Sequence, residues 1–151
     1  MRKFFVYFTL TGNGKFIAST LEEMGYISVQ IEMQKEVKKV GFFTILKFGG
    51  RAMFGKKEKL KRYFKDFEED DQIIIGSPIW NDRLSTPILT LLKEMDFDKE
   101  KTKFILYPAG KGTKKSLKQL KKMGFVQEPI VISNPLKDEE LTKELIEKAT
   151  M

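Results

Sequence analysis

Hydroxyl-bearing and small residues cluster where the first apolar segment of the chain gives way to a helical pattern, in the run Thr9-Leu10-Thr11-Gly12-Asn13-Gly14-Lys15. Two hydroxyls, free backbone N–H groups and the N-terminus of a helix would converge there, and together they suit a doubly charged phosphate. The two glycines would let the backbone approach the anion without a Cβ clash. The spacing matches neither the Walker P-loop nor the G-x-G-x-x-G fingerprint. The run therefore predicts a phosphate site, with an ordinary turn between strand and helix as the alternative.

Two more loops follow apolar segments that we expect to be strands of the same sheet. Gly76-Ser77-Pro78-Ile79-Trp80-Asn81-Asp82 holds the only tryptophan, and Tyr107-Pro108-Ala109-Gly110-Lys111-Gly112 is rich in glycine. Sheets built from alternating strands and helices bind ligands outside the carboxyl ends of their strands. The three loops are therefore expected to form one site, although Trp80 could instead serve only for packing.

The elements that position these loops follow from the hydrophobic pattern, which alternates apolar strands with amphipathic helices. We expect strands at 3–8, 26–33, 72–75, 103–107 and 125–133. Helices are expected at 13–24 and 113–122, from Pro87 with Thr86 as N-cap, and at 136–148 with Leu141, Leu145 and Ile146 inward. This order predicts one α/β domain over 1–151, with a parallel sheet covered by helices on both faces.

Composition limits the chemistry that side chains alone could perform. The 151 residues include no cysteine and no histidine, which excludes disulfides, thiol nucleophiles, Ser–His triads and the usual zinc sites. Any reaction is therefore expected to use a bound molecule. No apolar run approaches the ~20 residues of a membrane helix, and the run after Lys3 is too short for a signal peptide. We expect a cytoplasmic protein without integral membrane contact.

The positive charge is concentrated in one segment. The chain has a net charge of +7, and residues 33–65 hold nine Lys, two Arg and two Glu. Such a block can face an acidic protein, an anionic membrane surface or nucleic acid, or it can be a solvated face. No nucleic-acid motif accompanies it, so nucleic-acid binding is not favoured. We treat 34–65 as a basic, aromatic-rich, insertion-like segment that could cover the sheet or serve as a lid or docking surface.

The first two loops resemble those of the flavodoxins. The flavodoxin phosphate loop has the pattern [ST]-x-T-G-N-T, which Thr9 to Gly14 match at five of six positions, with Gly14 replacing the last Thr. The second loop is similar to the flavodoxin pattern G-x-x-x-W-G-D, with Asn81 in place of Gly. Asn is the non-glycine residue best able to adopt a positive φ. The resemblance implies a five-stranded, doubly wound sheet of order 2-1-3-4-5.

The resemblance also implies a cofactor, flavin mononucleotide (FMN), and residues that contact it. Trp80 would stack on the flavin ring, and the carbonyl of Asn81 would respond to protonation at N5. The full implied set is Thr9, Leu10, Thr11, Gly12, Asn13, Gly14, Lys15, Ser77, Pro78, Ile79, Trp80, Asn81, Asp82, Ala109, Gly110, Lys111 and Gly112. The second aromatic residue that often covers the other ring face in flavodoxins has no counterpart after Gly110.

The function implied by the resemblance is one-electron transfer between redox partner proteins. Acidic partners could dock on the basic 33–65 region, and the protein is expected to be a monomer or a weak dimer. Two alternatives remain open at this point. One is an FMN-dependent NAD(P)H reductase of a small acceptor, and the other is a flavodoxin-like module that has lost its cofactor.

Overall fold

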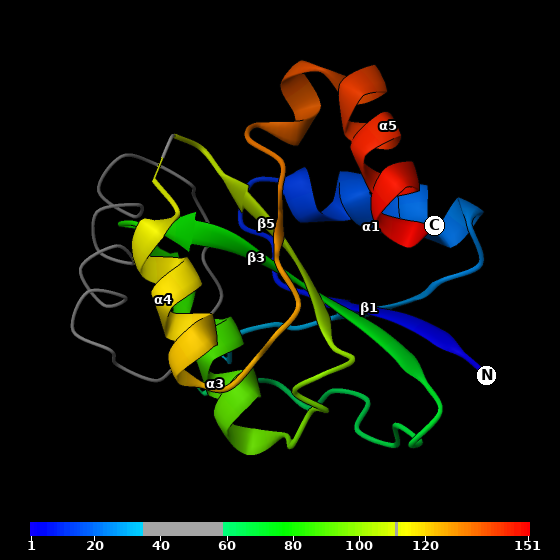
Figure 1. Cartoon of the computed structure of the whole chain (residues 1–151), viewed down its shortest axis with the longest axis vertical. Helices are drawn as coiled ribbons and strands as arrows, with labels where there is room; N and C mark the ends of the chain where they lie inside the picture. Colours follow the sequence, from blue (N-terminus) through cyan, green and yellow to red (C-terminus); the bar gives the residue numbers. More distant parts are fainter. Residues whose placement is uncertain (35–58, 111) are drawn as a thin grey trace.

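A parallel β-sheet forms the centre of the molecule, and helices cover both of its faces (Figure 1). The computed structural model describes residues 1–34, 59–110 and 112–151. The sheet has the strand order β2-β1-β3-β5-β6, with β4 paired to the end of β3. Counting only the parallel strands along the chain, this is the predicted order 2-1-3-4-5, so the predicted fold class is confirmed.

Among the described residues, five strands run parallel, and a sixth is a short antiparallel addition. The parallel strands are β1 (Lys3–Tyr7), β2 (Ile27–Gln30), β3 (Gln72–Trp80), β5 (Lys103–Pro108) and β6 (Ile130–Val131), and the antiparallel one is β4 (Arg83–Leu84). The helices are α1 (Asn13–Glu23), α3 (Thr86–Glu94), α4 (Lys114–Lys122) and α5 (Glu139–Thr150), with a 3-10 turn at Pro135–Lys137. Helices α1 and α5 lie on one face of the sheet, and α3 and α4 lie on the other (Figure 1).

Two hydrophobic cores, one on each face of the sheet, result from the alternation of side chains along the central strands. Phe4, Val6 and Phe8 belong to the core beneath α3 and α4, while Phe5 and Tyr7 belong to the core beneath α1 and α5. Since both faces are buried, β1 reads as a continuous apolar run, as expected for a parallel sheet. This strand ends at the loop that carries Thr9.

Strand β3 is longer than predicted. The sequence pattern ended it at Ile75 because Gly76-Ser77-Pro78 follows, whereas the strand continues to Trp80. Its pairing with β1 ends at Gly76, whose carbonyl accepts a hydrogen bond from Phe8 N. The backbone nitrogen of Pro78, two residues later, points to the same side of β3 as that of Gly76, but β1 has already ended there. The missing N–H of Pro78 therefore costs no ladder bond with β1.

Three other local predictions were wrong. The fifth parallel strand is β6, which covers only Ile130–Val131, and Pro129, which has no N–H to donate, precedes it. Ser85, not Thr86, is the N-cap of α3. Leu141 was expected to face inward but is 50% exposed, because α5 buries Thr142, which shares a helix face with Ile146 four residues later; Ile146 is buried as predicted.

Most of the basic 34–65 segment lies outside the described residues, so the expectations for its lid or covering role stay predictions. Its last part is described: Leu60 forms an isolated antiparallel bridge with Met33, and Phe64 stacks on Phe4. Among the described helices, none has the length and apolar character required to cross a bilayer.

Candidate functional site

The loop between β1 and α1 surrounds the N-terminus of α1. Helix α1 begins at Asn13, and its first turn contains no acidic residue. Gly12 is the N-cap and makes no side-chain cap, so the helix dipole is not offset by a carboxylate of α1 itself. The amides of Asn13 and Lys15 belong to the group that an α-helix leaves without intrahelical partners. Thr11 and Lys15 are exposed beside them. This arrangement suits an anion.

The side chain of Thr9 forms hydrogen bonds within this loop. Its hydroxyl oxygen accepts hydrogen bonds from the backbone N–H of Gly12, at 3.2 Å, and of Gly14, at 3.0 Å. Thr9 and Gly12 are half-buried, whereas Gly14 is buried beneath the loop. An anion at this loop would therefore use the amides of Asn13 and Lys15, or it would displace the Thr9 hydroxyl.

The two glycines of the loop are needed for different reasons. Gly12 has φ of 93°, a left-handed conformation, and open space surrounds the position where a Cβ would lie. Gly14 is crowded instead: a Cβ there would lie 2.8 Å from Thr9 Cβ, 2.8 Å from the Tyr107 hydroxyl and 2.9 Å from Tyr7 Cδ2. The departure of Gly14 from the flavodoxin pattern thus has a structural reason, because a threonine would not fit under this loop.

Tyr107, which the sequence placed at the end of a strand and the start of the third loop without a role of its own, packs beneath the first loop. It lies in β5, it is 2% exposed, and its hydroxyl donates a hydrogen bond to the carbonyl of Phe8. Burial raises the pKa of this hydroxyl well above its usual value, so it stays a donor at neutral pH. The only sequence signal for this role is indirect, namely the glycine at position 14.

The second loop forms a hairpin between β3 and β4. Asn81 and Asp82 lie between the paired residues Trp80 and Arg83, and their φ angles are 52° and 65°. Positive φ at both central residues is the geometry of a type I′ turn. The prediction that Asn81 can take the place of glycine at positive φ is therefore confirmed.

Trp80 lies in the core on the α3 and α4 face. It is 6% exposed, and its ring meets Phe8 edge to face at a centroid distance of 5.6 Å. This contact brings the first and second loops together. Because the Trp80 ring packs in the core, its stacking on a flavin stays a prediction.

The residues before Trp80 have mainly structural contacts. Ser77 is fully buried, and its hydroxyl lies 2.9 Å from that of Ser85 and accepts a hydrogen bond from Ser85 N at 3.1 Å. Its side chain is therefore unavailable to a ligand. Pro78 and Ile79 are half-buried and pair with Tyr107 and Pro108 of β5.

Asp82 joins the second loop to the third. Its backbone carbonyl accepts from Ser116 N at 2.8 Å, and its carboxylate lies 3.3 Å from Lys115 N, in the first turn of α4. A Cβ on Gly112 would lie 3.0 Å from the same carboxylate. The start of α4 is thus occupied by a carboxylate of the chain, a favourable interaction with the helix dipole.

The rest of the third loop is open. Ala109, Gly110 and Gly112 are exposed, and the carbonyl of Ala109 accepts a hydrogen bond from the side-chain amide of Asn134 at 3.0 Å. Lys111 lies outside the described residues. The structure therefore brings the three predicted loops together at one edge of the sheet, with Phe8, Tyr107 and Asp82 as the residues that connect them.

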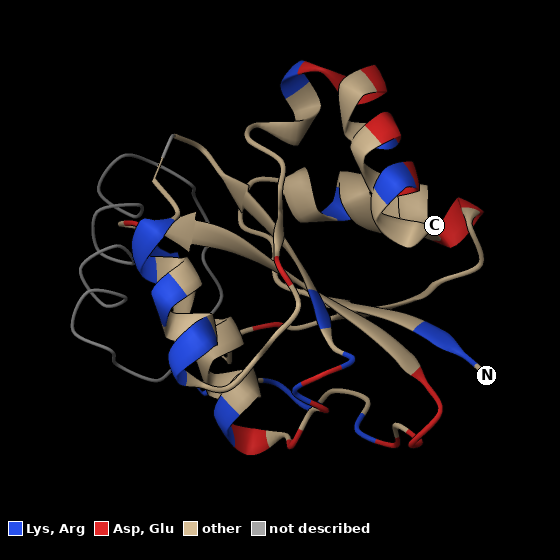
Figure 2. Ribbon diagram, viewed as in Figure 1, with Lys and Arg blue, Asp and Glu red and all other residues tan. Residues whose placement is uncertain are grey.

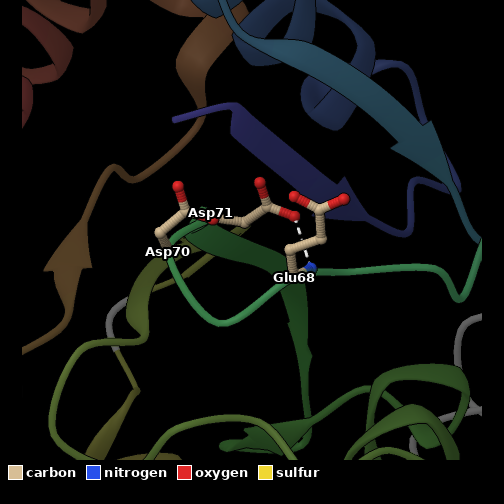
Figure 3. Close-up of side chains that lie close together, drawn as sticks. All are labelled: Glu68, Asp70 and Asp71. Atoms are coloured by element: carbon tan, nitrogen blue, oxygen red, sulfur yellow. Dashed lines mark hydrogen bonds between the residues drawn. The ribbon is translucent and has the colours of Figure 1, made fainter.

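An acidic cluster lies directly before β3, at the opposite end of that strand from the second loop. Carboxylate oxygens of Glu68, Asp70 and Asp71 gather within 4.8 Å of one another (Figure 3). Two positive groups face the cluster: Arg2 donates to Asp71 at 2.7 and 3.0 Å and lies 3.8 Å from Glu68, and the N-terminal ammonium of Met1 lies 3.9 Å from Asp70. The hydrogen bond from Arg2 lowers the pKa of Asp71. We therefore interpret the cluster as the partner of Arg2.

Similar solved structures share this fold. No protein-family model matches the sequence, and no curated protein matches it. A flavoprotein from Lactobacillus acidophilus, crystallised in complex with FMN, is 20% identical with a TM-score of 0.65, and the match covers 87% of this chain and 90% of that chain. A Bacteroides uniformis protein described as a putative flavoprotein is 18% identical with a TM-score of 0.71, and the match covers 97% of both chains.

A third solved structure has a similar fold. It is a protein from Bacteroides eggerthii, also described as a putative flavoprotein, with 16% identity, a TM-score of 0.68 and coverage of 99% of this chain and 98% of that chain. At such identities the likeness concerns architecture. The chain has the parallel α/β fold that these three proteins share, over nearly its whole length.

Proposed function

We propose that this protein binds FMN with its phosphate at the Thr9–Lys15 loop and transfers single electrons between redox partner proteins. The observation that carries the proposal is the start of α1, where no carboxylate of the first turn meets the helix dipole and where Thr11 and Lys15 are exposed. A helix N-terminus with free amides and an adjacent cation suits a dianion. The structural neighbour crystallised with FMN supports the same ligand.

The residues of the chain fit the phosphate end of FMN directly. Gly12 has no side chain above the loop, so an anion can approach its backbone. Thr11 offers a hydroxyl, and Lys15 offers a positive charge. Thr9 would keep the loop closed before binding, because its hydroxyl already accepts from the Gly12 and Gly14 amides.

The flavin would supply the redox chemistry, and the protein would supply binding and orientation. The flavin ring would lie across the second and third loops, near the turn formed by Asn81 and Asp82. Neither cysteine nor histidine occurs in the chain, so a carrier that relies on its cofactor agrees with the composition. Acidic redox partners docking on the 33–65 region belong to this proposal.

Titration with FMN and with riboflavin, which lacks the phosphate, tests the proposal. Flavin fluorescence reports binding of both. We expect FMN to bind at least about tenfold more tightly, since charged hydrogen bonds contribute about 1.5–3 kcal/mol each. Equal affinities would contradict a phosphate site at α1, and failure to take up either flavin would indicate a module without a cofactor.

A matched pair of variants locates the phosphate. Thr11→Ala should lower FMN affinity about fivefold and leave riboflavin affinity unchanged. Thr113→Ala is the control, because Thr113 is the N-cap of α4 and its side chain makes no cap bond. Steady oxidation of NAD(P)H by the purified protein alone would favour the reductase over the electron carrier.

A further inference from the structure

Helix α4 presents a positive surface for which the described residues offer no counter-charge. Five of its nine residues are lysines, and it contains no acidic residue. All five are exposed, and none of them forms a salt bridge with a described carboxylate. Figure 2 shows the blue bands of these lysines along α4. Unpaired like charges on one helix repel each other, so this surface is held at a cost in stability.

An apolar groove runs beside these lysines. It has a volume of about 350 Å³ and lies between α4 and the segment that follows it. Leu117, Phe125, Val126 and Pro129 supply much of its apolar lining. Phe125 is 5% exposed and forms part of the floor, whereas Val126 is 66% exposed. The groove is therefore a hollow that could accept a projecting apolar side chain.

Positive charge borders this groove. Lys114, Lys118 and Lys121 line it, and their spacing of four and three residues places them on one side of α4. Lys99 adds a fourth cation, with its Nζ 4.2 Å from the centroid of the Phe125 ring. Glu128 is the single acidic residue among the described residues that line the groove.

We propose that the α4 groove binds an acidic segment of a partner protein, with an aliphatic side chain of that segment in the groove and its carboxylates beside Lys114, Lys118 and Lys121. Charge complementarity identifies the occupant, because a row of unpaired lysines favours a negative partner. The proposal does not depend on FMN binding. Its residues also lie outside the 33–65 segment of the sequence.

The shape of the site favours a protein over a membrane or a nucleic acid. Membrane-surface helices project large apolar side chains outward, whereas Leu120 and Phe125 lie inside the groove at 2% and 5% exposure. Sites for single-stranded nucleic acids offer exposed aromatic rings for base stacking. The aromatic ring of this groove, Phe125, is buried and covered by Lys99.

A defined peptide tests the proposal. The probe is a fluorescein-labelled peptide of repeated Glu-Glu-Leu units, compared with a polyglutamate peptide of equal length, and binding is followed by fluorescence anisotropy. We expect the Leu-containing peptide to bind more tightly, and its affinity to fall as salt rises. Val126→Ser should reduce the affinity of the Leu-containing peptide about threefold and leave polyglutamate unaffected.

Two double variants of α4 separate the groove from general electrostatics. Lys118→Gln/Lys121→Gln removes two charges that line the groove and should weaken binding about fivefold, the effect of two exposed ion pairs. Lys115→Gln/Lys122→Gln removes two charges from the same helix outside the groove and should change the affinity less than twofold. Circular dichroism checks that both variants keep their helix content.

Three results would overturn the proposal. Equal losses in the two double variants would mean that the charge acts without a groove. Equal affinities for the two peptides would mean that the apolar lining plays no part. Tighter binding of duplex DNA or phosphatidylglycerol vesicles than of the Leu-containing peptide would assign the surface to another class of partner.

Discussion

Helices α1 and α4 each follow a parallel strand, yet their N-termini contact different groups of the chain. At α4, the carboxylate of Asp82 lies 3.3 Å from Lys115 N, so a negative charge of the chain itself meets the helix dipole. At α1, the N-cap is Gly12, the first turn has no acidic residue, and Lys15 is exposed. The N-terminus of α4 meets a carboxylate of the chain, whereas that of α1 meets, among the described residues, only the Thr9 hydroxyl, and we propose that it binds an external anion.

The difference shows how one edge of a sheet can separate a structural position from a binding position. A helix N-terminus that is already paired with a carboxylate gains little from a phosphate, because the two negative charges would repel each other. Five predictions test this contrast, in order of decreasing expected effect.

Gly14→Thr, which would restore the flavodoxin pattern, should have the largest effect. Its Cβ would lie 2.8–2.9 Å from Thr9, Tyr107 and Tyr7, so the loop would have to move. We expect a loss of about 3 kcal/mol in unfolding free energy, measured by urea denaturation. Gly110→Thr is the control, since nothing lies within 4 Å of its Cβ position. Equal stability of the two variants would contradict the crowding at α1.

Tyr107→Phe should have the next largest effect. It removes the donor to the Phe8 carbonyl and leaves that acceptor buried without its partner. We expect a loss of about 1.5 kcal/mol in stability and weaker FMN binding. Tyr26→Phe is the control, because Tyr26 is 8% exposed and its hydroxyl makes no described hydrogen bond. A loss in both variants alike would argue against a specific role under the loop.

The same tyrosine predicts how stability changes at alkaline pH. Because burial raises its pKa in the folded state, the unfolded chain loses this proton first, near pH 10. Its contribution is therefore complete below that pH and falls as the pH rises further. The difference in unfolding free energy between the wild type and Tyr107→Phe should thus shrink above about pH 10. A constant difference would contradict the raised pKa.

Asp82→Asn should have a smaller effect, on stability alone. It removes the charge at the start of α4, which we expect to cost about 0.5–1 kcal/mol. The ratio of FMN to riboflavin affinities should stay unchanged, because the phosphate is proposed to bind at α1. Thermal unfolding and the two flavin titrations measure these effects. A change in the affinity ratio would place the phosphate at α4 and reverse the contrast.

Lys15→Gln should have the smallest effect, confined to binding. Loss of one exposed cation beside the phosphate should lower FMN affinity about threefold and leave riboflavin affinity unchanged. Lys115→Gln, in the first turn of α4, should alter neither. The difference between the two variants should decrease as salt is added. Equal effects of the two lysines would remove the distinction between the two helix N-termini.

Sequence patterns predicted the five parallel strands and the four described helices in their order along the chain, but not the short strand β4 or the 3-10 turn. The apolar run that became β1, the helical spacing after Asn13 and the strand at β5 each appear within a short window, because alternation and 3.6-residue periodicity are local properties. The residues at which the elements end were predicted less accurately. The extension of β3 through Pro78 depends on where its neighbour β1 ends, and no pattern within the strand contains that information.

The features of the candidate site also fall into those that the sequence determined and those that only the tertiary structure decided. The sequence by itself determined the glycine-rich turn after β1, its exposed hydroxyl and lysine, and the ability of Asn81 to adopt a positive φ. Only the tertiary structure decided that Asp82 satisfies α4, that Tyr107 fills the space beside Gly14, and that Trp80 packs on Phe8. Those contacts join residues separated by tens of positions along the chain. They exist only because parallel pairing brings the carboxyl ends of β1, β3 and β5 to the same edge.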